Sequence, residues 1–264
     1  MDIDAVTAIL EEAAEEAIVP RFGALADGDV TEKAAGEVVT IADREAEDLI
    51  TPRLRELVDA PVVGEEATAA NPALLTALTS APVAWVLDPL DGTANFVAGK
   101  PAWAVMAALI RDGETVASWI VRPADRQVYT AERGGGAWRN NVRIRRAPPP
   151  ADVAELRGVA HTRFLPPQQR ATVLAARDRF AQLGPGASCA GFDYPQLADG
   201  ELDFVLFWRT LPWDHAPGTL LVTEAGGVAR RPDGQPYRPA SDAAGLLNAA
   251  GDSCWSAVRP ALLR

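Results

Sequence analysis

Two carboxylates, Asp88 and Asp91, stand close together at the end of an apolar run, and their spacing suggests metal chemistry. The run over residues 83–87 has the composition of a buried strand, and Pro89 lies between the two acidic residues. A stiff proline turn can aim both side chains at one point. Such carboxylates repel each other, and burying either one costs several kcal/mol unless a cation or a proton compensates. A hard divalent cation such as Mg²⁺ is the natural compensation, because it takes oxygen ligands.

The residues around this pair add groups suited to a metal-bound phosphate. The Leu90 carbonyl lies between the carboxylates and is a candidate further ligand. Gly92 allows the backbone to approach a ligand closely, and the segment after Thr93 can open a helix whose free N–H groups attract phosphate. The same letters also fit an ordinary Asp-Gly turn with a capping aspartate, so other segments must decide.

Three further segments place polar groups at the ends of predicted elements. Glu65 follows a short apolar strand, where it could complete the coordination of a first metal; a solvated pair of glutamates is the simpler interpretation. Asp214 opens an apolar helix, which also fits an ordinary N-cap. Thr40 and Asp43 place a hydroxyl and a carboxylate at another helix start.

The elements that must position these groups divide into two halves. Helical periodicity covers residues 4–19 and 41–57, with Pro20 and Pro52 expected to stop or interrupt the helices and a polar loop between them. Short β-type runs then follow at residues 62–63, 83–87, 103–110, 115–121 and 127–131, with glycine turns at 112–113 and 134–136. The pattern predicts an α+β N-terminal half with a largely antiparallel sheet.

Consecutive prolines at residues 148–150 mark the predicted internal boundary, between an N-terminal subdomain over 1–146 and a C-terminal subdomain over 151–264. Beyond the prolines, strands alternate with helices. The strands are predicted near 156–160, 203–207 and 246–249, and the helices at 167–183, 192–198, 214–225 and from residue 253. This alternation predicts an α/β C-terminal half that carries Asp214.

Composition excludes several classes of protein. The 36 acidic residues outnumber the 25 basic ones, and the net charge of −11 repels polyphosphate backbones, so we expect no nucleic-acid partner. The longest apolar run, over residues 102–110, falls far short of the ~20 residues that span a bilayer, so we expect no membrane partner. An acidic start without a basic export signal, and only two cysteines, predict a cytoplasmic location.

Taken together and in this order, the segments resemble the inositol monophosphatase family. The matching motifs are Gly64-Glu65-Glu66, then Trp85-Val86-Leu87-Asp88-Pro89-Leu90-Asp91-Gly92-Thr93-Ala94-Asn95-Phe96, then Trp213-Asp214 with Thr223-Glu224-Ala225-Gly226-Gly227. The resemblance runs from residue 38 to residue 227. It implies a layered αβαβα sandwich, commonly a homodimer, that hydrolyses a small phosphorylated metabolite with Mg²⁺ and is sensitive to lithium.

The resemblance also implies roles for individual residues. One Mg²⁺ would be held by Glu65, Asp88 and the Leu90 carbonyl. A second would be held by Asp88, Asp91 and Asp214, and Glu65 would touch a third, weaker one. Gly92 and Thr93 would bind phosphate, and Thr93 with Asp43 would orient a water that attacks phosphorus. No covalent enzyme intermediate is required.

The chain departs from the family pattern where the leaving group would bind. Inositol-specific members carry a glutamate seven residues before the last metal-ligand aspartate, where it grips sugar hydroxyls, and this chain has Phe207. Their Gly-Thr or Gly-Ser substrate loop is replaced here by the segment containing Ser188, Cys189 and Ala190, whose backbone N–H groups could still contact substrate.

Several residues near this segment are candidates to contact the leaving group: Asp193, Tyr194, Trp208, Arg209 and His215. Arg209 could pair with a second phosphate or a carboxylate, or be a solvated loop residue. Phe207 and Trp208 are interpreted as packing residues, and His161, outside every motif, as structural.

We therefore predict a phosphatase acting on a sugar or polyol phosphate. A histidinol-phosphate or 3′-phosphonucleotide phosphatase of the same fold is an alternative, as is a catalytically weak regulatory protein. A metal-dependent nuclease is disfavoured by the negative charge.

Overall fold

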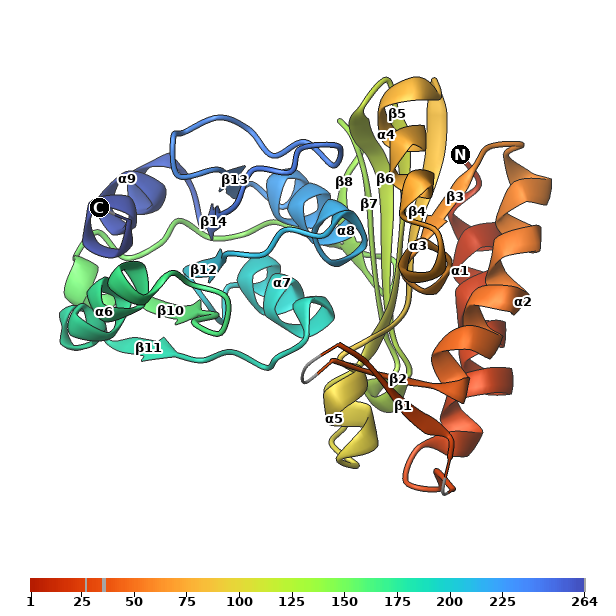
Figure 1. The fold of residues 1–264 in the computed structure, drawn as a ribbon. Helices are drawn as coiled ribbons and strands as arrows, with labels where there is room; N and C mark the ends of the chain where they lie inside the picture. The colour runs from red at the N-terminus through yellow and green to blue at the C-terminus, as the bar shows by residue number, and fades with distance from the viewer. Residues whose placement is uncertain (27, 35–36, 264) are drawn as a thin grey trace.

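Helices and sheets alternate in layers through the computed structural model, which describes residues 1–26, 28–34 and 37–263. Within these residues, α1 (Ile3–Ala13) and α2 (Ile41–Leu57) cover one face of a seven-stranded sheet (Figure 1). Helices α7 (Ala190–Asp199) and α8 (Pro212–Glu224) separate that sheet from a five-stranded sheet. Helices α6 (Pro167–Ala175) and α9 (Asp252–Leu262) cover the far side. The predicted αβαβα sandwich is confirmed.

The larger sheet has the strand order β3-β4-β5-β6-β7-β8-β9. Strand β3 (Val62–Gly64) pairs in parallel with β4 (Val83–Asp91), and all later neighbours pair antiparallel, as predicted. The sequence did not predict the last two strands, which are short and carry few apolar residues. The remaining strands are β5 (Ala104–Arg111), β6 (Glu114–Arg122), β7 (Gln127–Glu132), β8 (Gly136–Arg139) and β9 (Val142–Ile144).

The smaller sheet has the order β11-β10-β12-β14-β13 and is mixed. Strand β10 (Arg157–Ala160) is parallel to β11 (Gln182–Gly184) and to β12 (Phe204–Phe207). Strand β14 (Leu246–Ala249) is antiparallel to both β12 and β13 (Val228–Arg230). The division into subdomains at residues 147–150 remains a prediction.

Two expectations about helices were wrong. The helix predicted over 167–183 ends at Ala175, because the chain beyond it turns and pairs as β11 with β10. Pro52 does not interrupt α2, since the flanking Ile50 and Leu54 are fully buried and packing outweighs the one backbone hydrogen bond that proline removes. The expected end of the first helix at Pro20 is confirmed, through a π-turn over Ala14–Ile18 and a 3₁₀ turn over Val19–Arg21.

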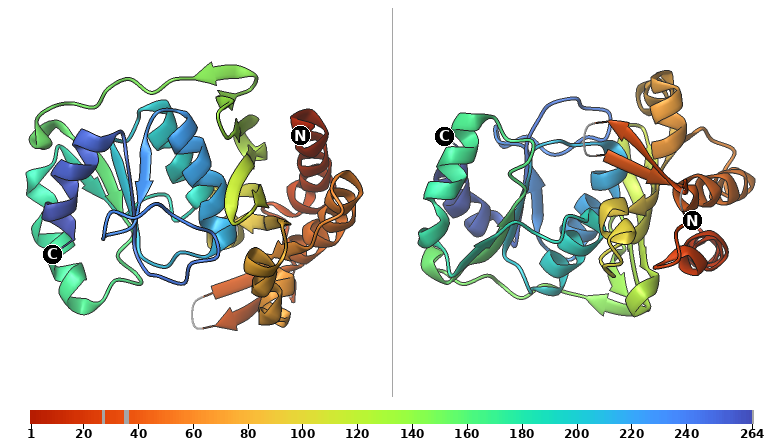
Figure 2. Two further views of the ribbon diagram at one scale, coloured as in Figure 1. Left: turned by 90° about the horizontal axis from the view of Figure 1, so that it is seen from above. Right: turned by 60° about the horizontal axis from the view of Figure 1, so that its bottom comes forward.

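The polar loop predicted between the first two helices contains a hairpin of β1 (Val30–Ala34) and β2 (Glu37–Thr40). Its connection, residues 35–36, lies outside the described residues. The hairpin lies beside α5 (Thr93–Val97) and belongs to neither main sheet (Figure 2). The strands escaped prediction because they alternate poorly between apolar and polar residues. The short helices α3 (Glu65–Ala70) and α4 (Ala77–Ser80) complete this half, and no helix in the described residues is long and apolar enough to cross a membrane.

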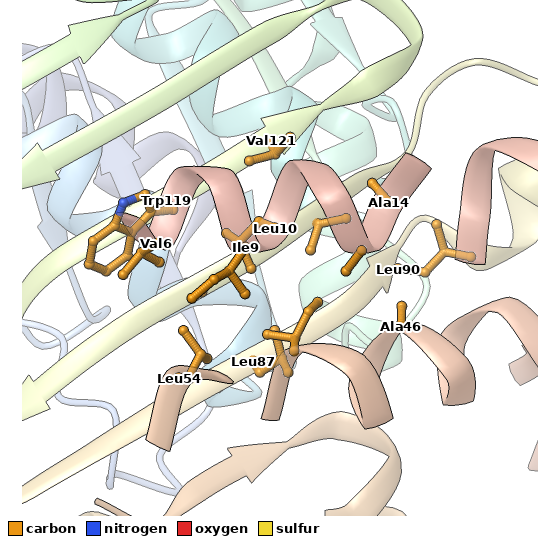
Figure 3. Close-up of a cluster of buried hydrophobic side chains, with 14 of the residues drawn as sticks. Val6, Ile9, Leu10, Ala14, Ala46, Leu54, Leu87, Leu90, Trp119 and Val121 are labelled. Carbon is orange, nitrogen blue, oxygen red and sulfur yellow. The ribbon is translucent and has the colours of Figure 1, made fainter. Parts of the chain in front are cut away.

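Strand β4 is buried on both faces, which explains its uninterrupted apolar sequence. Leu87 and Leu90 pack with Leu10 of α1 and Leu54 of α2 in the core between helices and sheet (Figure 3). Val86, pointing to the other face, packs in a separate cluster that includes residues of α4 and α8. A strand held on both faces cannot slip by one residue without turning its side chains over. The position of the acidic residues at its end is therefore fixed.

Candidate active site

The acidic residues lie at one edge of the larger sheet. Gly64 at the end of β3 pairs in parallel with Leu87, so Glu65 and Asp88 both leave the sheet at the same edge. The pairing of β4 with β5 shifts register between Asp88 and Asp91, where the Pro89-Leu90 turn interrupts the ladder. Asp214 comes from the other half of the chain, in the first turn of α8. The topology therefore joins local and distant carboxylates.

Glu65, Asp88, Asp91 and Asp214, which we call the acidic wall, line one cavity of about 250 Å³. Thr93, Gly92 and Leu90 line it as well. The same cavity is lined by aromatic rings, which we call the aromatic wall: His161, Phe164, Phe207, Trp208 and His215. The structure thus brings the predicted carboxylates together around a space that could hold a small molecule.

Burial disfavours the ionised form of the three aspartates in the acidic wall. Asp88 is 1% exposed, and burial raises its pKa well above the usual value, as do the charges of Glu65, Asp91 and Asp214. Burial likewise raises the pKa of Asp91 to about 6, although hydrogen bonds from Cys189 and Gly191 oppose the shift. The pKa of Asp214 is raised for the same reason. The Arg209 charge near Asp214 and the hydrogen bonds to Asp91 oppose the pKa shifts of these carboxylates without reversing them.

Their hydrogen-bond donors are neutral. The Leu90 N–H donates to Asp88 Oδ1 at 3.0 Å, and the Gly191 N–H donates to Asp91 Oδ2 at 2.6 Å. The Cys189 thiol also donates to Asp91 Oδ2, at 3.0 Å. In the described part of the chain neither aspartate forms an ion pair. Clustered carboxylate oxygens that lack a protein cation are a donor set suited to a hard divalent ion.

The carboxylates of the acidic wall do not form a complete set of metal ligands in the described residues. Among residues 1–26, 28–34 and 37–263, no three His, Cys, Asp or Glu side chains converge closely enough to hold an ion as they stand. Glu65 instead accepts from Lys33 Nζ at 2.9 Å, and Lys33 also pairs with Glu66. Lys33 lies on β1, within the region predicted as a loop, so this contact could not be predicted from local sequence.

Asp43 and Thr93 meet beside the acidic wall. Thr40 caps α2, and its N–H and hydroxyl donate to Asp43 Oδ2 at 2.8 and 2.6 Å in a capping box. The Thr93 hydroxyl lies 3.0 Å from Asp43 Oδ1 and 2.9 Å from the Leu90 carbonyl, and donates to one of them at a time. Asp43 is fully buried, and burial raises its pKa to about 7.

Gly92 sits where only glycine fits. Its φ of +85° is left-handed, and an added Cβ would lie 2.7 Å from the Ala102 carbonyl oxygen. Asn95 donates to that same carbonyl at 2.9 Å and to the Ala187 carbonyl at 2.8 Å, which ties the predicted substrate loop to α5. Ser188, Cys189 and Ala190 all line the cavity.

His215 and Tyr194 support the aromatic wall from within. His215 Nε2 donates to the Arg209 carbonyl at 2.9 Å, so Nδ1 accepts from the Tyr194 hydroxyl at 2.9 Å. Burial lowers the pKa of His215 to about 3, which keeps the ring neutral. With both nitrogens occupied, His215 has none left for a leaving group.

Arg209 lines the cavity, but its guanidinium pairs with Glu37 of β2 and lies 4.2 Å from the centroid of the Phe164 ring. Its predicted contact with substrate remains a prediction. Sequence reasoning missed His161, which was interpreted as structural and lies in the cavity wall. Its place directly after the apolar strand over 157–160 was the one available signal, since strand ends often carry functional groups.

The fold and the cavity define a layered α/β sandwich with an acidic site at the edge of its larger sheet. Residues 2–258 match the model of the inositol monophosphatase family. The chain belongs to this family, as the motifs around Glu65, Asp88 and Asp214 predicted. Members of the family are metal-dependent phosphatases.

Individual relatives agree with the family match. The chain is 39% identical over 160 residues to an inositol-1-monophosphatase of Mesorhizobium japonicum, covering 57% of each protein. It is 34% identical over 152 residues to the Nus factor SuhB of Vibrio cholerae, covering 55% of each. A solved IMPase structure from Thermotoga maritima superposes with a TM-score of 0.83 at 26% identity, covering 99% of this chain and 97% of that one. The matched sequence spans less than two thirds of the curated relatives.

Proposed function

We propose that this protein hydrolyses a small phosphate monoester, such as a sugar or polyol phosphate, with the help of bound Mg²⁺. The observation that carries the proposal is the acidic wall: carboxylates from β4, from the residue after β3 and from α8 line one cavity, and among the described residues neither Asp88 nor Asp91 forms an ion pair. A dianionic phosphate could not approach such a wall without cations.

The acidic wall supplies the ligands. Glu65, Asp88 and the Leu90 carbonyl would hold one ion, and Asp88, Asp91 and Asp214 a second; the family resemblance suggests these sets and a weaker third ion at Glu65. When bound, such ions neutralise phosphate oxygens and lower the pKa of water. Lys33 engages one oxygen of Glu65, at 2.9 Å from Oε1, so Glu65 would bind the first ion through its other oxygen or after Lys33 moves.

The chain's own residues would position the attacking water. Thr93 donates its only hydroxyl proton to Asp43 or to the Leu90 carbonyl, so its oxygen lone pairs are free to accept a hydrogen bond from water. The buried capping box fixes Asp43 and thereby orients Thr93. Glu65, at the same edge, is the second candidate acceptor for a proton from that water.

Phosphate binding falls to the turn after β4 and to the loop facing it. Gly92 lets the turn adopt a left-handed conformation and pack closely against Ala102 and Cys189, which places its backbone and Thr93 in the cavity lining. Ser188, Cys189 and Ala190 line the cavity next to this turn, and their backbone N–H groups are candidate contacts. The Cys189 thiol is directed to Asp91, so that residue would contact substrate through its backbone rather than its side chain. Arg209 is the candidate for a second anionic group on the substrate.

The test is a panel of esters assayed with and without divalent ions. The purified protein should release phosphate from inositol 1-phosphate, glycerol 2-phosphate, histidinol phosphate or 3′-phosphoadenosine in the presence of Mg²⁺, and EDTA should abolish release. Ranking the esters by kcat/KM separates a polyol phosphatase from the histidinol-phosphate and 3′-phosphonucleotide alternatives. No hydrolysis of any ester with Mg²⁺ would contradict the proposal.

A regulatory role is the second candidate, because a relative of similar identity is named the Nus factor SuhB. The fold alone does not separate the two roles. A protein that binds Mg²⁺ by calorimetry but turns over every ester of the panel only at trace rates would favour the regulatory role.

We also propose that the protein acts as a homodimer in the cytoplasm. Family resemblance suggests the dimer, and the two free, buried cysteines, Cys189 and Cys254, fit a reducing compartment. Sedimentation equilibrium would measure the oligomeric state directly.

A further inference from the structure

His161 is held in place by a buried carboxylate. It follows β10, and its Nε2 lies 2.7 Å from Oδ2 of Asp193, in the first turn of α7. Asp193 is 0% exposed, and its other oxygen accepts from the Ala187 N–H at 3.0 Å. Because a carboxylate only accepts, Nε2 carries the proton of this bond. A histidine whose ring is oriented by a carboxylate recurs at metal and catalytic sites.

The ring of His161 is also held from one face. It stacks on Phe207 at 4.6 Å between centroids and 14° between planes, and Tyr194 stacks on Phe207 at 5.2 Å and 27°. His215 lies 4.7 Å from the same Phe207 ring. Phe207 is only 6% exposed, so it cannot serve as a stacking platform for a substrate. Its role is to support the imidazole of His161.

One nitrogen of that imidazole stays available. In the described residues, Nδ1 of His161 has no hydrogen-bond partner, while the ring lines the cavity and the side chain is 20% exposed. Because the acidic wall would hold the phosphate and its cations, the aromatic wall is the part of the lining left for the alcohol part of the ester. His161 is therefore a polar group fixed on the leaving-group side, whereas both nitrogens of its neighbour His215 are occupied.

We propose that His161 is a specificity-determining residue that hydrogen-bonds, through Nδ1, to a hydroxyl group of the substrate's alcohol. A hydroxyl both donates and accepts, so it can satisfy Nδ1 whether or not that nitrogen carries a proton. The substrate class is a phosphate ester of a hydroxylated alcohol. Asp193 and Phe207 act as positioning residues. This inference rests on the proposed phosphatase function and specifies which side chain reads the leaving group.

The experiment compares two esters that differ in leaving-group hydroxyls. Glycerol 2-phosphate offers them and p-nitrophenyl phosphate does not. The variant is the double substitution His161→Phe with Asp193→Asn, which keeps a ring on Phe207 and avoids an unpaired buried carboxylate. We expect kcat/KM for glycerol 2-phosphate to fall about tenfold or more, the loss of one hydrogen bond at a buried site, and that for p-nitrophenyl phosphate to change less than about twofold.

A second variant tests positioning. Asp193→Asn alone offers Nε2 an amide donor, which reverses the tautomer and leaves Nδ1 as a donor only. It should lower the preference for glycerol 2-phosphate by a smaller factor. Asp199→Asn, on the same helix, removes a carboxylate that accepts from Tyr129 at 2.9 Å outside the cavity, and it should leave the preference unchanged.

The outcomes are distinct. An equal fall for both esters, or no change for either, would overturn the assignment of His161, as would a wild-type protein that cleaves p-nitrophenyl phosphate but no hydroxylated ester. If the wild-type protein with Mg²⁺ cleaves neither kind of ester, the phosphatase function itself fails. Circular dichroism of each variant verifies that the fold is retained.

Discussion

The acidic wall and the aromatic wall of the cavity differ in how their polar groups are satisfied. In the described residues, Asp88 and Asp91 lie buried with neutral partners, and burial raises both pKa values. On the aromatic wall, both ring nitrogens of His215 are engaged with protein, and His161 is held through Nε2 by the buried Asp193 and keeps only Nδ1 available. The acidic wall thus lacks a counter-charge until a cation binds, whereas the aromatic wall is held in place by bonds and ring contacts within the protein. We therefore assign the reaction to the acidic wall, which lacks a cation of its own, and substrate selectivity to the His161 ring of the aromatic wall.

The largest effect should come from removing one charge of the acidic wall. Asp91→Asn should lower Mg²⁺-dependent kcat/KM by about 1,000-fold, because a lost metal ligand removes several kcal/mol of transition-state stabilisation. Without metal, its free energy of unfolding should equal or exceed that of the wild type, since Asn Oδ1 can still accept from Gly191. Phosphate release measures kcat/KM, and urea denaturation in EDTA measures the free energy of unfolding of the metal-free protein. Asp252→Asn, on α9, is the matched control and should keep wild-type kcat/KM. A lower free energy of unfolding in Asp91→Asn would contradict the view that the acidic wall lacks a counter-charge without metal.

A smaller loss should follow from removing the hydroxyl that links the acidic wall to Asp43. Thr93→Val should lower kcat by about 100-fold, the usual contribution of a group that handles a proton or orients water, with Mg²⁺ affinity by calorimetry little changed. Thr223→Val removes a hydroxyl that bonds within α8 and does not line the cavity, so its kcat should match the wild type. Equal kcat for both variants would exclude the role given to Thr93.

The aromatic wall should respond in stability instead. His215→Leu leaves the Tyr194 hydroxyl and the Arg209 carbonyl without their partner, so we expect the free energy of unfolding to fall by about 2 to 4 kcal/mol. Urea denaturation of the metal-free protein gives the value. A change in the free energy of unfolding below about 0.5 kcal/mol would show that the hydrogen bonds of His215 do not hold this wall in place.

The parts of the site that the sequence predicted are those encoded locally. The two aspartates, Gly92 and Thr93 follow one strand within six residues, so the strand and its turn determine their positions together. The capping box of Thr40 and Asp43 is likewise local. Asp214 was predicted because its motif resembles the family, since nothing local distinguishes a metal ligand from an N-cap.

The parts that escaped prediction depend on contacts between distant residues. Lys33 reaches Glu65 from a hairpin whose strands lack alternation, and Asp193 meets His161 only because α7 packs against β10 and β12. The helix predicted to residue 183 ended early for the same reason, because pairing with β10 outweighs helical periodicity. Such contacts arise from packing, which the order of residues in one segment does not reveal.

The carboxylate of Asp91 also holds the two halves of the molecule together. It belongs to β4 of the larger sheet, yet it accepts from Gly191 and Cys189 at the start of α7. An ion bound there would interact with both layers at once, so occupancy and interlayer cohesion must reinforce each other by mass action. Depletion of divalent ions would then shorten the lifetime of the folded chain against proteases as well as stop turnover, which makes the supply of metal a determinant of how much protein persists.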